Sequence, residues 1–225
     1  MRISQSQSPF TRFYSLCRHL LAEVESAKYL GIIITNELKW SDQLTAVANR
    51  GSSTLGFIKR NLKGCPFRLK EIAYITLVRS VLEYSAPIWD PHLAKDIQAL
   101  ERIQRRAARF VKSDYAHTSS VTSMLEELGW KNLAHRRRDL RLALLFKVVN
   151  DQIAVPVDSI NLEHTDSRTR SSHGYTFRVQ RAQTDELKFS FAPRTIIEWN
   201  SLPASVVDAD SVETFRSRLA KVAWD

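Results

Sequence analysis

The stretch LAKDIQALERIQRRAARFVK (Leu93–Lys112) is the clearest indication of a helical fold, because its apolar and basic residues fall on two sides of a helix. At about 100° per residue, the apolar side carries Ile97, Leu100, Ile103, Ala107, Phe110 and Val111. The opposite side carries Arg102, Arg105, Arg106, Arg109 and Lys112, with Glu101 as the nearby acid. The pattern predicts a rigid helix that presents cations to a polyanion such as nucleic acid. A merely solvated basic face is the competing interpretation.

The composition indicates a globular chain with an uneven charge. Its 225 residues fit one large domain or two small ones, and 44% of them are hydrophobic, which is enough for a core. The net charge is +9; residues 41–115 carry thirteen Lys/Arg against seven Asp/Glu, whereas residues 151–225 carry nine against eleven. The positive charge therefore belongs to predicted helices and favours phosphate binding. Attraction to an anionic membrane surface is less favoured, because the apolar faces resemble core stripes.

The sequence also predicts where the protein works. Its two cysteines, Cys17 and Cys65, suit a reducing compartment, and residues 1–10 form no apolar signal segment. No stretch approaches the 18 apolar residues of a membrane span. We expect an intracellular protein, nuclear or cytoplasmic and not secreted.

The remaining periodicity predicts an α+β fold that is mostly α. Residues 9–36 are expected to form strands, with a tight connection at Cys17–His19 and a buried β-branched strand over Lys28–Thr35. Ser41 and Ser211 are expected to cap helices, and Gly129 to end one in a left-handed conformation. Helices are expected over residues 41–62, 68–85, 93–112, 120–128, 133–150, 195–199 and after 211. We divide the chain into an N-terminal β-hairpin region (1–40), a helical bundle (41–115) and a smaller mixed C-terminal region (116–225).

No motif for catalysis or metal binding stands out. Polymerases need carboxylates that converge on two metal ions, and the chain has no Asp-Asp pair. Asp208-Ala209-Asp210 precedes a helix cap and favours a solvated loop, and Glu126 and Glu127 would project about 100° apart on a helix. Zinc-ligand spacings, a nucleophile elbow and a phosphate-binding glycine loop are missing. The residues by themselves predict no catalytic residue, no metal and no cofactor, and they favour binding.

Four tryptophans lie at predicted element ends, where they could stack on unpaired bases. They are Trp40, Trp89, Trp130 and Trp199. Large rings that seal helix junctions are the favoured interpretation.

Several short motifs follow one another in a fixed order over residues 10–220. They are YLGI (29–32), LKW (38–40), LVRSVLEY (77–84), WDP (89–91), LERIQRRAARF (100–110), LGW (128–130) followed by Arg136-Arg137, SFAPRT (190–195) and WNSLP (199–203). In this order they resemble the C-terminal part of the reverse transcriptases of non-LTR, LINE-type retrotransposons, and jockey-like elements above all.

This resemblance implies an architecture and a parent activity. It implies a palm-end β-hairpin known as the primer grip, a thumb that lies over the template–primer duplex, and a C-terminal region that binds RNA or target DNA. The parent activity is RNA-directed DNA synthesis, with Mg²⁺ expected only with a palm that carries a Tyr-Ala-Asp-Asp hairpin. Because fingers, palm and endonuclease would precede the hairpin region, the chain is similar to a truncated copy. We therefore expect a basic fragment that binds nucleic acid without catalysis.

Site residues follow from the resemblance and from the cations. Lys28, Tyr29, Leu30 and Gly31 match the primer-grip strand and would contact a primer backbone beside a palm. Phosphate contacts are expected from Lys59, Arg60, Lys63, Arg102, Arg105, Arg106, Arg109, Lys112, Arg136, Arg137, Arg138 and Arg141. The first three also suit a helix C-terminus without any ligand. Two of the last four could instead pair with Glu126, Glu127 or Asp139.

Two other functions stay open at this point. The chain could be a domesticated helical module that binds proteins through apolar helix faces, without any nucleic-acid function. It could also be an active enzyme, which a primer-extension assay would reveal. The expected partners are RNA, an RNA–DNA duplex and an intact copy of the reverse transcriptase.

Overall fold

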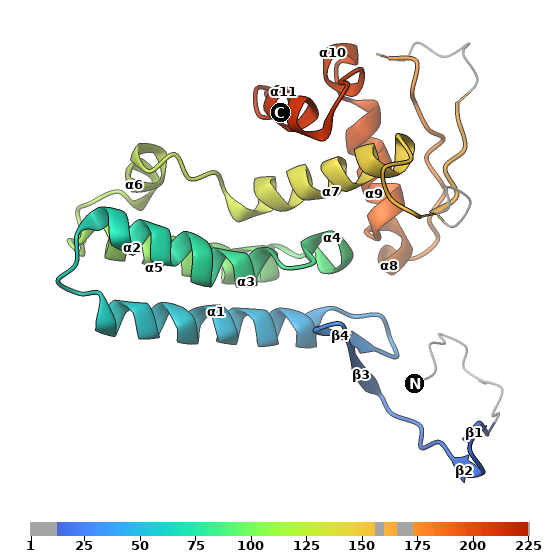
Figure 1. Ribbon diagram of the computed structural model, residues 1–225, viewed down its shortest axis with the longest axis horizontal. Coiled ribbons are helices and arrows are strands. Elements are labelled where there is room, and N and C mark those ends of the chain that lie inside the picture. The colour runs from blue at the N-terminus through green and yellow to red at the C-terminus, as the bar shows by residue number, and fades with distance from the viewer. Residues whose placement is uncertain (1–12, 156–159, 166–172, 225) are drawn as a thin grey trace. The chain divides into compact units, whose positions relative to one another are not determined.

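The protein is an α+β chain, mostly α, that divides into two compact units. The computed structural model describes residues 13–155, 160–165 and 173–224 (Figure 1). Unit 1 holds the described residues up to Ser85 together with Leu93–Asp114, and unit 2 holds Ala86–His92 together with the described residues from Tyr115 onward. The predicted hairpin region therefore belongs to the same unit as the predicted helical bundle. A segment of seven residues inside that bundle belongs to unit 2 instead.

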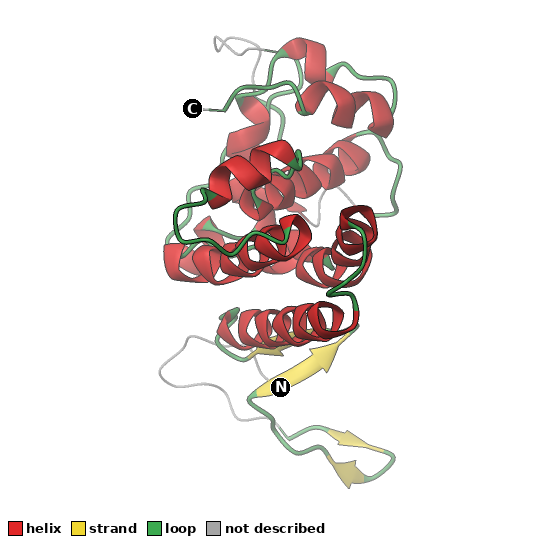
Figure 2. Cartoon of the chain, turned by 90° about the vertical axis from the view of Figure 1, so that its left-hand side faces the viewer, coloured by secondary structure: helices red, strands yellow, loops and turns green. Residues whose placement is uncertain are grey.

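Unit 1 begins with two small antiparallel hairpins, drawn as yellow arrows in Figure 2. The first pairs β1 (Ser15–Leu16) with β2 (His19–Leu20). Cys17 and Arg18 connect them with positive φ angles of 50° and 66°, as the tight two-residue turns of hairpins require. The predicted connection at Cys17–His19 is therefore present, although Phe10 of the expected strand region lies outside the described residues.

The second hairpin corrects the prediction of one strand over Lys28–Thr35. β3 (Ser26–Tyr29) pairs with β4 (Ile32–Thr35), and the chain turns between them at Leu30 and Gly31, with φ angles of 47° and 85°. Glycine adopts positive φ without steric cost, so Gly31 allows a turn where continuous apolar sequence suggested a strand. All of β3 is exposed, whereas β4 packs on α1 (Ser41–Asn61).

Three helical rods form the rest of unit 1. α1 packs against α5 (Ala94–Lys112) and against a continuous rod made of α2 (Phe67–Ala73), the π-helix η1 (Tyr74–Arg79) and α3 (Ser80–Glu83). Their shared core is fully or almost fully buried and contains Leu55, Ile58, Tyr74, Val78, Leu82, Leu100, Ile103, Ala107, Phe110 and Val111. Gly51 of α1 permits this close packing, because a Cβ atom there would lie 2.7 Å from a methyl carbon of Leu82.

The ends of these helices are only partly as predicted. α1 starts at Ser41, but Trp40 occupies the cap position and no side chain caps the helix. Ser113 ends α5 in a left-handed conformation with φ of 55°. There it accepts a 2.7 Å hydrogen bond from Nζ of the buried Lys70, which places a cation at the negative end of the helix dipole.

Unit 2 is built around α7 (Leu133–Val149), which packs against three other helices. These are α4 (Ala86–Trp89), α9 (Phe191–Asn200) and α11 (Val212–Leu219). The rings of Phe146 and Phe215 stack with centroids 4.5 Å apart, and Trp199 stacks on Phe215 at 5.9 Å. This aromatic cluster is the centre of the unit 2 core.

Shorter helices complete unit 2. They are α6 (Val121–Glu127), α8 (Asp185–Lys188) and α10 (Ala204–Val207). Ser211 caps α11, as predicted, by accepting a hydrogen bond from the backbone N–H of Thr214. Gly129 follows α6 with φ of 64°, which confirms the expected left-handed position. Phe177 forms an isolated antiparallel bridge with His164.

None of the helices in the described ranges has the length and apolar character needed to cross a membrane.

Candidate nucleic-acid interface

The rotation of α5 about its axis is fixed by contacts on its inner side. Leu100, Ile103 and Ala107 are buried at 0–1% exposure. The buried Gln104 accepts a 3.0 Å hydrogen bond from the hydroxyl of Tyr74, so a polar contact adds direction to the apolar packing. Because the inner side is held in this way, the basic side of the helix has a defined orientation away from the core.

Three arginines on that outer side are exposed, and we call Arg102, Arg105 and Arg106 the α5 arginine row. Nη2 of Arg106 donates to the Ser52 hydroxyl at 2.8 Å, and Nε of Arg102 donates to the Gln98 carbonyl at 3.3 Å. These acceptors are neutral, so the hydrogen bonds position two guanidinium groups without neutralising their charge. The row thus keeps the cationic character that the sequence predicted for this helix.

Arg109 and Lys112 extend this side toward the C-terminal end of α5. Arg109 is half-buried and Lys112 is exposed, and both already interact with other groups of the chain. At 1.5 Å per residue, the span from Arg102 to Lys112 is about 15 Å. A surface of that length can follow a few phosphates of one strand.

The cations at the end of α1 lie where a helix dipole favours them. Lys59 is half-buried, and Arg60 and Lys63 are exposed. Lys59 and Arg60 belong to the last turn of α1, whose carbonyl groups attract positive charge without any ligand. Their position therefore supports a structural role as well as phosphate binding.

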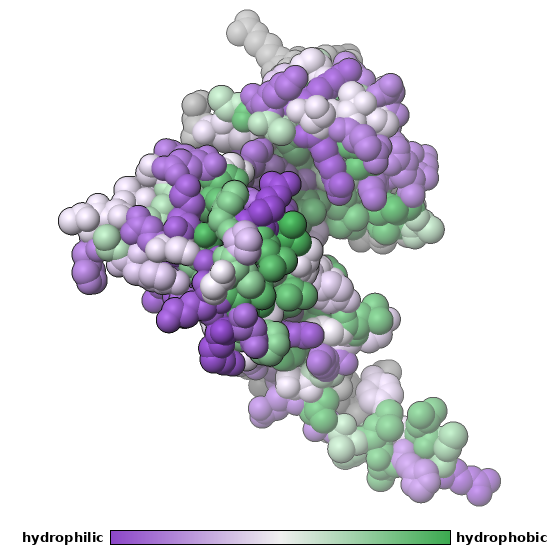
Figure 3. All heavy atoms as spheres, turned by 60° about the vertical axis from the view of Figure 1, so that its left-hand side comes forward, coloured by the Kyte–Doolittle hydropathy of each residue, from purple (hydrophilic) through white to green (hydrophobic). Residues whose placement is uncertain are grey.

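The β3–β4 turn is anchored to the end of α3. The hydroxyl of Tyr84 donates to the Leu30 carbonyl at 3.0 Å, and a Cβ atom on Gly31 would lie 3.4 Å from the Tyr84 ring. Lys28 is exposed, and Tyr29 and Leu30 keep 66% and 72% of their surface exposed. The hairpin region carries many other exposed large side chains: Phe13, Tyr14, Leu16, Leu20, Leu21 and Val24. Green, hydrophobic spheres gather at the lower right of Figure 3, where this region lies.

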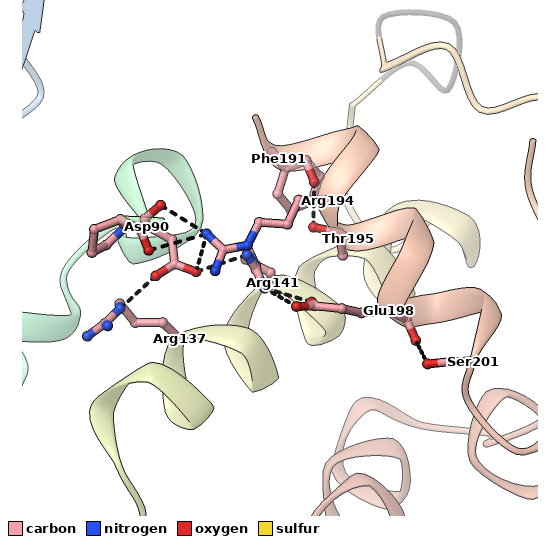
Figure 4. Close-up of polar contacts among 9 residues, drawn as sticks. Asp90, Arg137, Arg141, Phe191, Arg194, Thr195, Glu198 and Ser201 are labelled. Carbon is pink, nitrogen blue, oxygen red and sulfur yellow. Dashed lines mark hydrogen bonds and ion pairs between the residues drawn. The ribbon is translucent and has the colours of Figure 1, made fainter. Parts of the chain in front are cut away.

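Arg137 and Arg141, expected to extend the basic surface, are buried inside unit 2 instead. Nε of Arg137 donates to Oδ1 of Asp90 at 2.7 Å, and Nη1 of Arg141 lies 2.9 Å from Oδ2 of the same carboxylate (Figure 4). Nη2 of Arg141 also contacts both carboxylate oxygens of Glu198, at 2.8 and 2.6 Å. The expectation that these two arginines contact the phosphates of a nucleic acid is therefore wrong, because their side chains are 0–1% exposed and paired with carboxylates.

Arg194 joins the same network from α9. Its Nη1 lies 3.3 Å from Oδ2 of Asp90 and donates to the Asp90 and Pro91 carbonyls at 3.2 and 3.4 Å. Burial lowers the pKa of Arg194, and the neighbouring charge of Arg141 lowers it further. Burial also raises the pKa of Glu198, although Arg141 and Arg194 oppose that shift. We call Asp90, Arg137, Arg141, Arg194 and Glu198 the buried network.

The other two arginines of α7 are half-buried. The guanidinium carbon of Arg138 lies 3.8 Å from the centre of the Trp224 ring, in a cation–π contact. Arg136 interacts with another group of the chain. The sequence left open that two of these arginines pair with Glu126, Glu127 or Asp139. Arg137 and Arg141 pair with Asp90 and Glu198 instead.

Sequence reasoning missed the acids of the buried network. Asp90 stood out only as part of the WDP motif, and Glu198 and Arg194 were not expected as partners of α7. The signal in the sequence was the place of Asp90 between Trp89, a large apolar residue, and Pro91. The distance of 47 residues from Asp90 to Arg137 hid the pairing.

The tryptophans and the residue types that bind metals are the remaining features considered from the sequence. Trp89, Trp130 and Trp199 are buried, which agrees with the interpretation that they seal helix junctions, and Trp40 is half-buried. In the described residues, no group of three or more His, Cys, Asp or Glu side chains is arranged to hold a metal ion.

Comparisons of the chain with family models, with curated proteins and with solved structures give no match.

Proposed function

We propose that unit 1 binds the sugar-phosphate backbone of RNA or of an RNA–DNA duplex through the α5 arginine row. We also propose that the chain derives from the C-terminal part of a non-LTR retrotransposon reverse transcriptase. The observation that supports binding is the exposure of Arg102, Arg105 and Arg106 on a helix whose other side is locked into a core. Like charges held close together on a rigid element repel each other until a polyanion lies against them.

The chemistry of the row fits backbone contacts better than base recognition. A guanidinium group presents a planar fork of donors that matches phosphate oxygens. Contacts of this kind position a strand without reading its sequence. We therefore expect binding to RNA and to an RNA–DNA duplex with little preference for sequence.

Salt dependence tests the proposal. The plot of log affinity for a duplex against log salt concentration has a negative slope of about 0.9 per phosphate contact. In the Arg102→Gln, Arg105→Gln, Arg106→Gln triple variant this slope should be smaller in magnitude by about 3, because three contacts are lost. A matched control removes three exposed cations from unit 2, in the Arg181→Gln, Arg216→Gln, Lys221→Gln variant, and so lowers the net charge equally. The control should keep the slope of the original chain.

Equal slopes in the two triple variants would contradict the proposal, because net charge alone would then govern binding. Affinity that does not fall with salt would favour the protein-interaction module instead, because hydrophobic interfaces do not release counterions. A Mg²⁺-dependent product in a primer-extension assay would show that the chain itself is an enzyme.

A further inference from the structure

The buried network of unit 2 contains more positive than negative charge. The guanidinium groups of Arg137, Arg141 and Arg194 all form ion pairs with Asp90, and Arg141 also pairs with Glu198. Three positive groups therefore face two carboxylates. Guanidinium groups stay protonated in proteins, so these five side chains carry one positive charge in excess. Arg194 and Glu198 each keep 23% of their side-chain surface exposed, whereas Arg137, Arg141 and Asp90 are buried and by themselves carry the same excess. Buried charges are normally paired, because an unpaired charge away from water is costly.

The donors without a partner have a definite place, at the far end of Arg137. Its Nε donates to Asp90, but its Nη1 and Nη2 make no hydrogen bond with any described residue. Both atoms point away from the Asp90 carboxylate in Figure 4, and the side chain is 0% exposed. A fully buried guanidinium group therefore presents a two-pronged edge of donors that has no acceptor among the described residues.

Arg141 shows the same shortage of acceptors. Its Nη1 is close enough to Asp90 for an ion pair, but the angle does not make it a hydrogen bond, and its Nε has no partner among the described residues. Asp90 cannot supply more, because its two oxygens already face three arginines. The acceptor that this network needs must come from outside these five side chains.

We infer that unit 2 encloses a small oxyanion, of the size and charge of inorganic phosphate, against the Nη1–Nη2 edge of Arg137. The fork of a guanidinium group matches two oxygens of such an ion, and one negative charge would balance the network. The complete burial of Arg137 restricts the ligand to a compact ion that unit 2 traps as it folds, and excludes a phosphate within a polymer. This inference concerns unit 2 and does not depend on nucleic-acid binding by unit 1.

Thermal unfolding of the full chain tests the inference. Inorganic phosphate is titrated at constant ionic strength, with sodium chloride as the reference salt. A ligand that binds only the folded state at 100 times its Kd should raise the Tm by about 5–10 °C. The Arg102→Gln, Arg105→Gln, Arg106→Gln variant should keep this shift, because it removes only the exposed phosphate-binding candidates.

The Arg137→Met variant should lose the shift, since it removes the fork and leaves Arg141 and Arg194 balanced by two carboxylates. An unchanged Tm of the original chain in phosphate, an equal shift in Arg137→Met, or loss of the shift in the α5 triple variant would overturn the inference. If Arg137→Met does not fold, equilibrium dialysis of the α5 triple variant decides the question. One phosphate bound per chain supports the site, and none overturns it.

Discussion

Two helices of this chain carry arginines that lie in opposite environments, Arg105 and Arg106 on α5 and Arg137 and Arg141 on α7. On α5 the guanidinium groups are exposed, and the acceptor for Arg106 is a hydroxyl. On α7, Arg137 is fully buried and contacts a carboxylate at 2.7 Å. The same residue type thus serves a surface in unit 1 and an interior in unit 2.

The cause of this difference lies away from the arginines themselves. α5 sets its apolar residues on one side only, so its arginines have no interior to enter. α7 is apolar on more of its circumference, and Asp90 and Glu198 approach it from the end of α4 and from α9. A cluster of arginines in a sequence therefore predicts a ligand-binding surface only when no buried acid is available to it.

Removing Asp90 should give the largest effect, because this carboxylate contacts all three arginines of the buried network. Asp90→Ala leaves Arg137, Arg141 and Arg194 with Glu198 as the remaining acid of the network, so we expect a loss of about 3–5 kcal/mol in the free energy of unfolding. Urea unfolding followed by tryptophan fluorescence measures it, because Trp89, Trp130 and Trp199 are buried in unit 2. The exposed Asp208 provides the control, and Asp208→Ala should change stability by less than about 0.5 kcal/mol.

Exchanging arginine for lysine separates the two environments more sharply. Arg141→Lys keeps the charge but cannot contact Asp90 and Glu198 together, so we expect a loss of about 2–3 kcal/mol. Arg105→Lys should leave both the stability and the salt slope of binding unchanged, because counterion release depends on charge. If Arg141→Lys were as stable as the original chain, the planar geometry of the buried network would have no energetic role.

The parts of this fold that sequence reasoning predicted are those set by local pattern. α5 was expected over residues 93–112 and spans Ala94–Lys112, because its 3.6-residue period and its turn signals lie within the helix itself. The Ser211 cap and the Gly129 position are local in the same sense. The turn at Leu30–Gly31 was missed because a continuous apolar run resembles a buried strand, and the positive φ of Leu30 is not expected from its residue type.

The residues of the candidate site also divide into those placed by local pattern and those placed by contacts with distant residues. The outward direction of Arg102, Arg105 and Arg106 follows from helix period alone. The burial of Arg137 and Arg141 depends on carboxylates 47 and 57 residues away, whose approach no local pattern encodes. The family resemblance and the nucleic-acid partners stay predictions.

A glycine test compares how the two units are stabilised. Gly51→Ala places a Cβ atom 2.7 Å from a methyl carbon of Leu82, in the apolar core of unit 1. Overpacking should exceed the gain in helix propensity and cost about 1 kcal/mol, since the Leu82 side chain can move partly aside. Hydrogen exchange should then show lower protection in α1 and α5 and unchanged protection in α7.

Gly64→Ala is the matched control, because a Cβ atom there has no neighbour within 4 Å. It should leave protection unchanged in both units. Faster exchange in α7 after Gly51→Ala would show that the two units unfold together. The apolar core of unit 1 and the buried network of unit 2 would then stabilise one cooperative structure.

The smallest expected effect is a pH dependence carried by Glu198. Burial raises the pKa of this carboxyl above its ordinary value, so at a pH between the two values the folded chain holds a proton that the unfolded chain has released. The stability contributed by this group is therefore complete below the ordinary pKa of about 4.3 and is lost as the pH rises through the raised value.

Glu198→Gln imitates the protonated acid and should remove that loss, so its stability relative to the original chain should increase from pH 4 to pH 7. Glu163→Gln, at an exposed acid paired with Arg178, should show no such trend when urea midpoints are compared. If the relative stability of Glu198→Gln fell with rising pH, the ion pair between Glu198 and Arg141 would outweigh the cost of burying the carboxylate. The charged form of Glu198 would then be the stable one in the interior of unit 2, just as charged side chains are stable on the surface of unit 1.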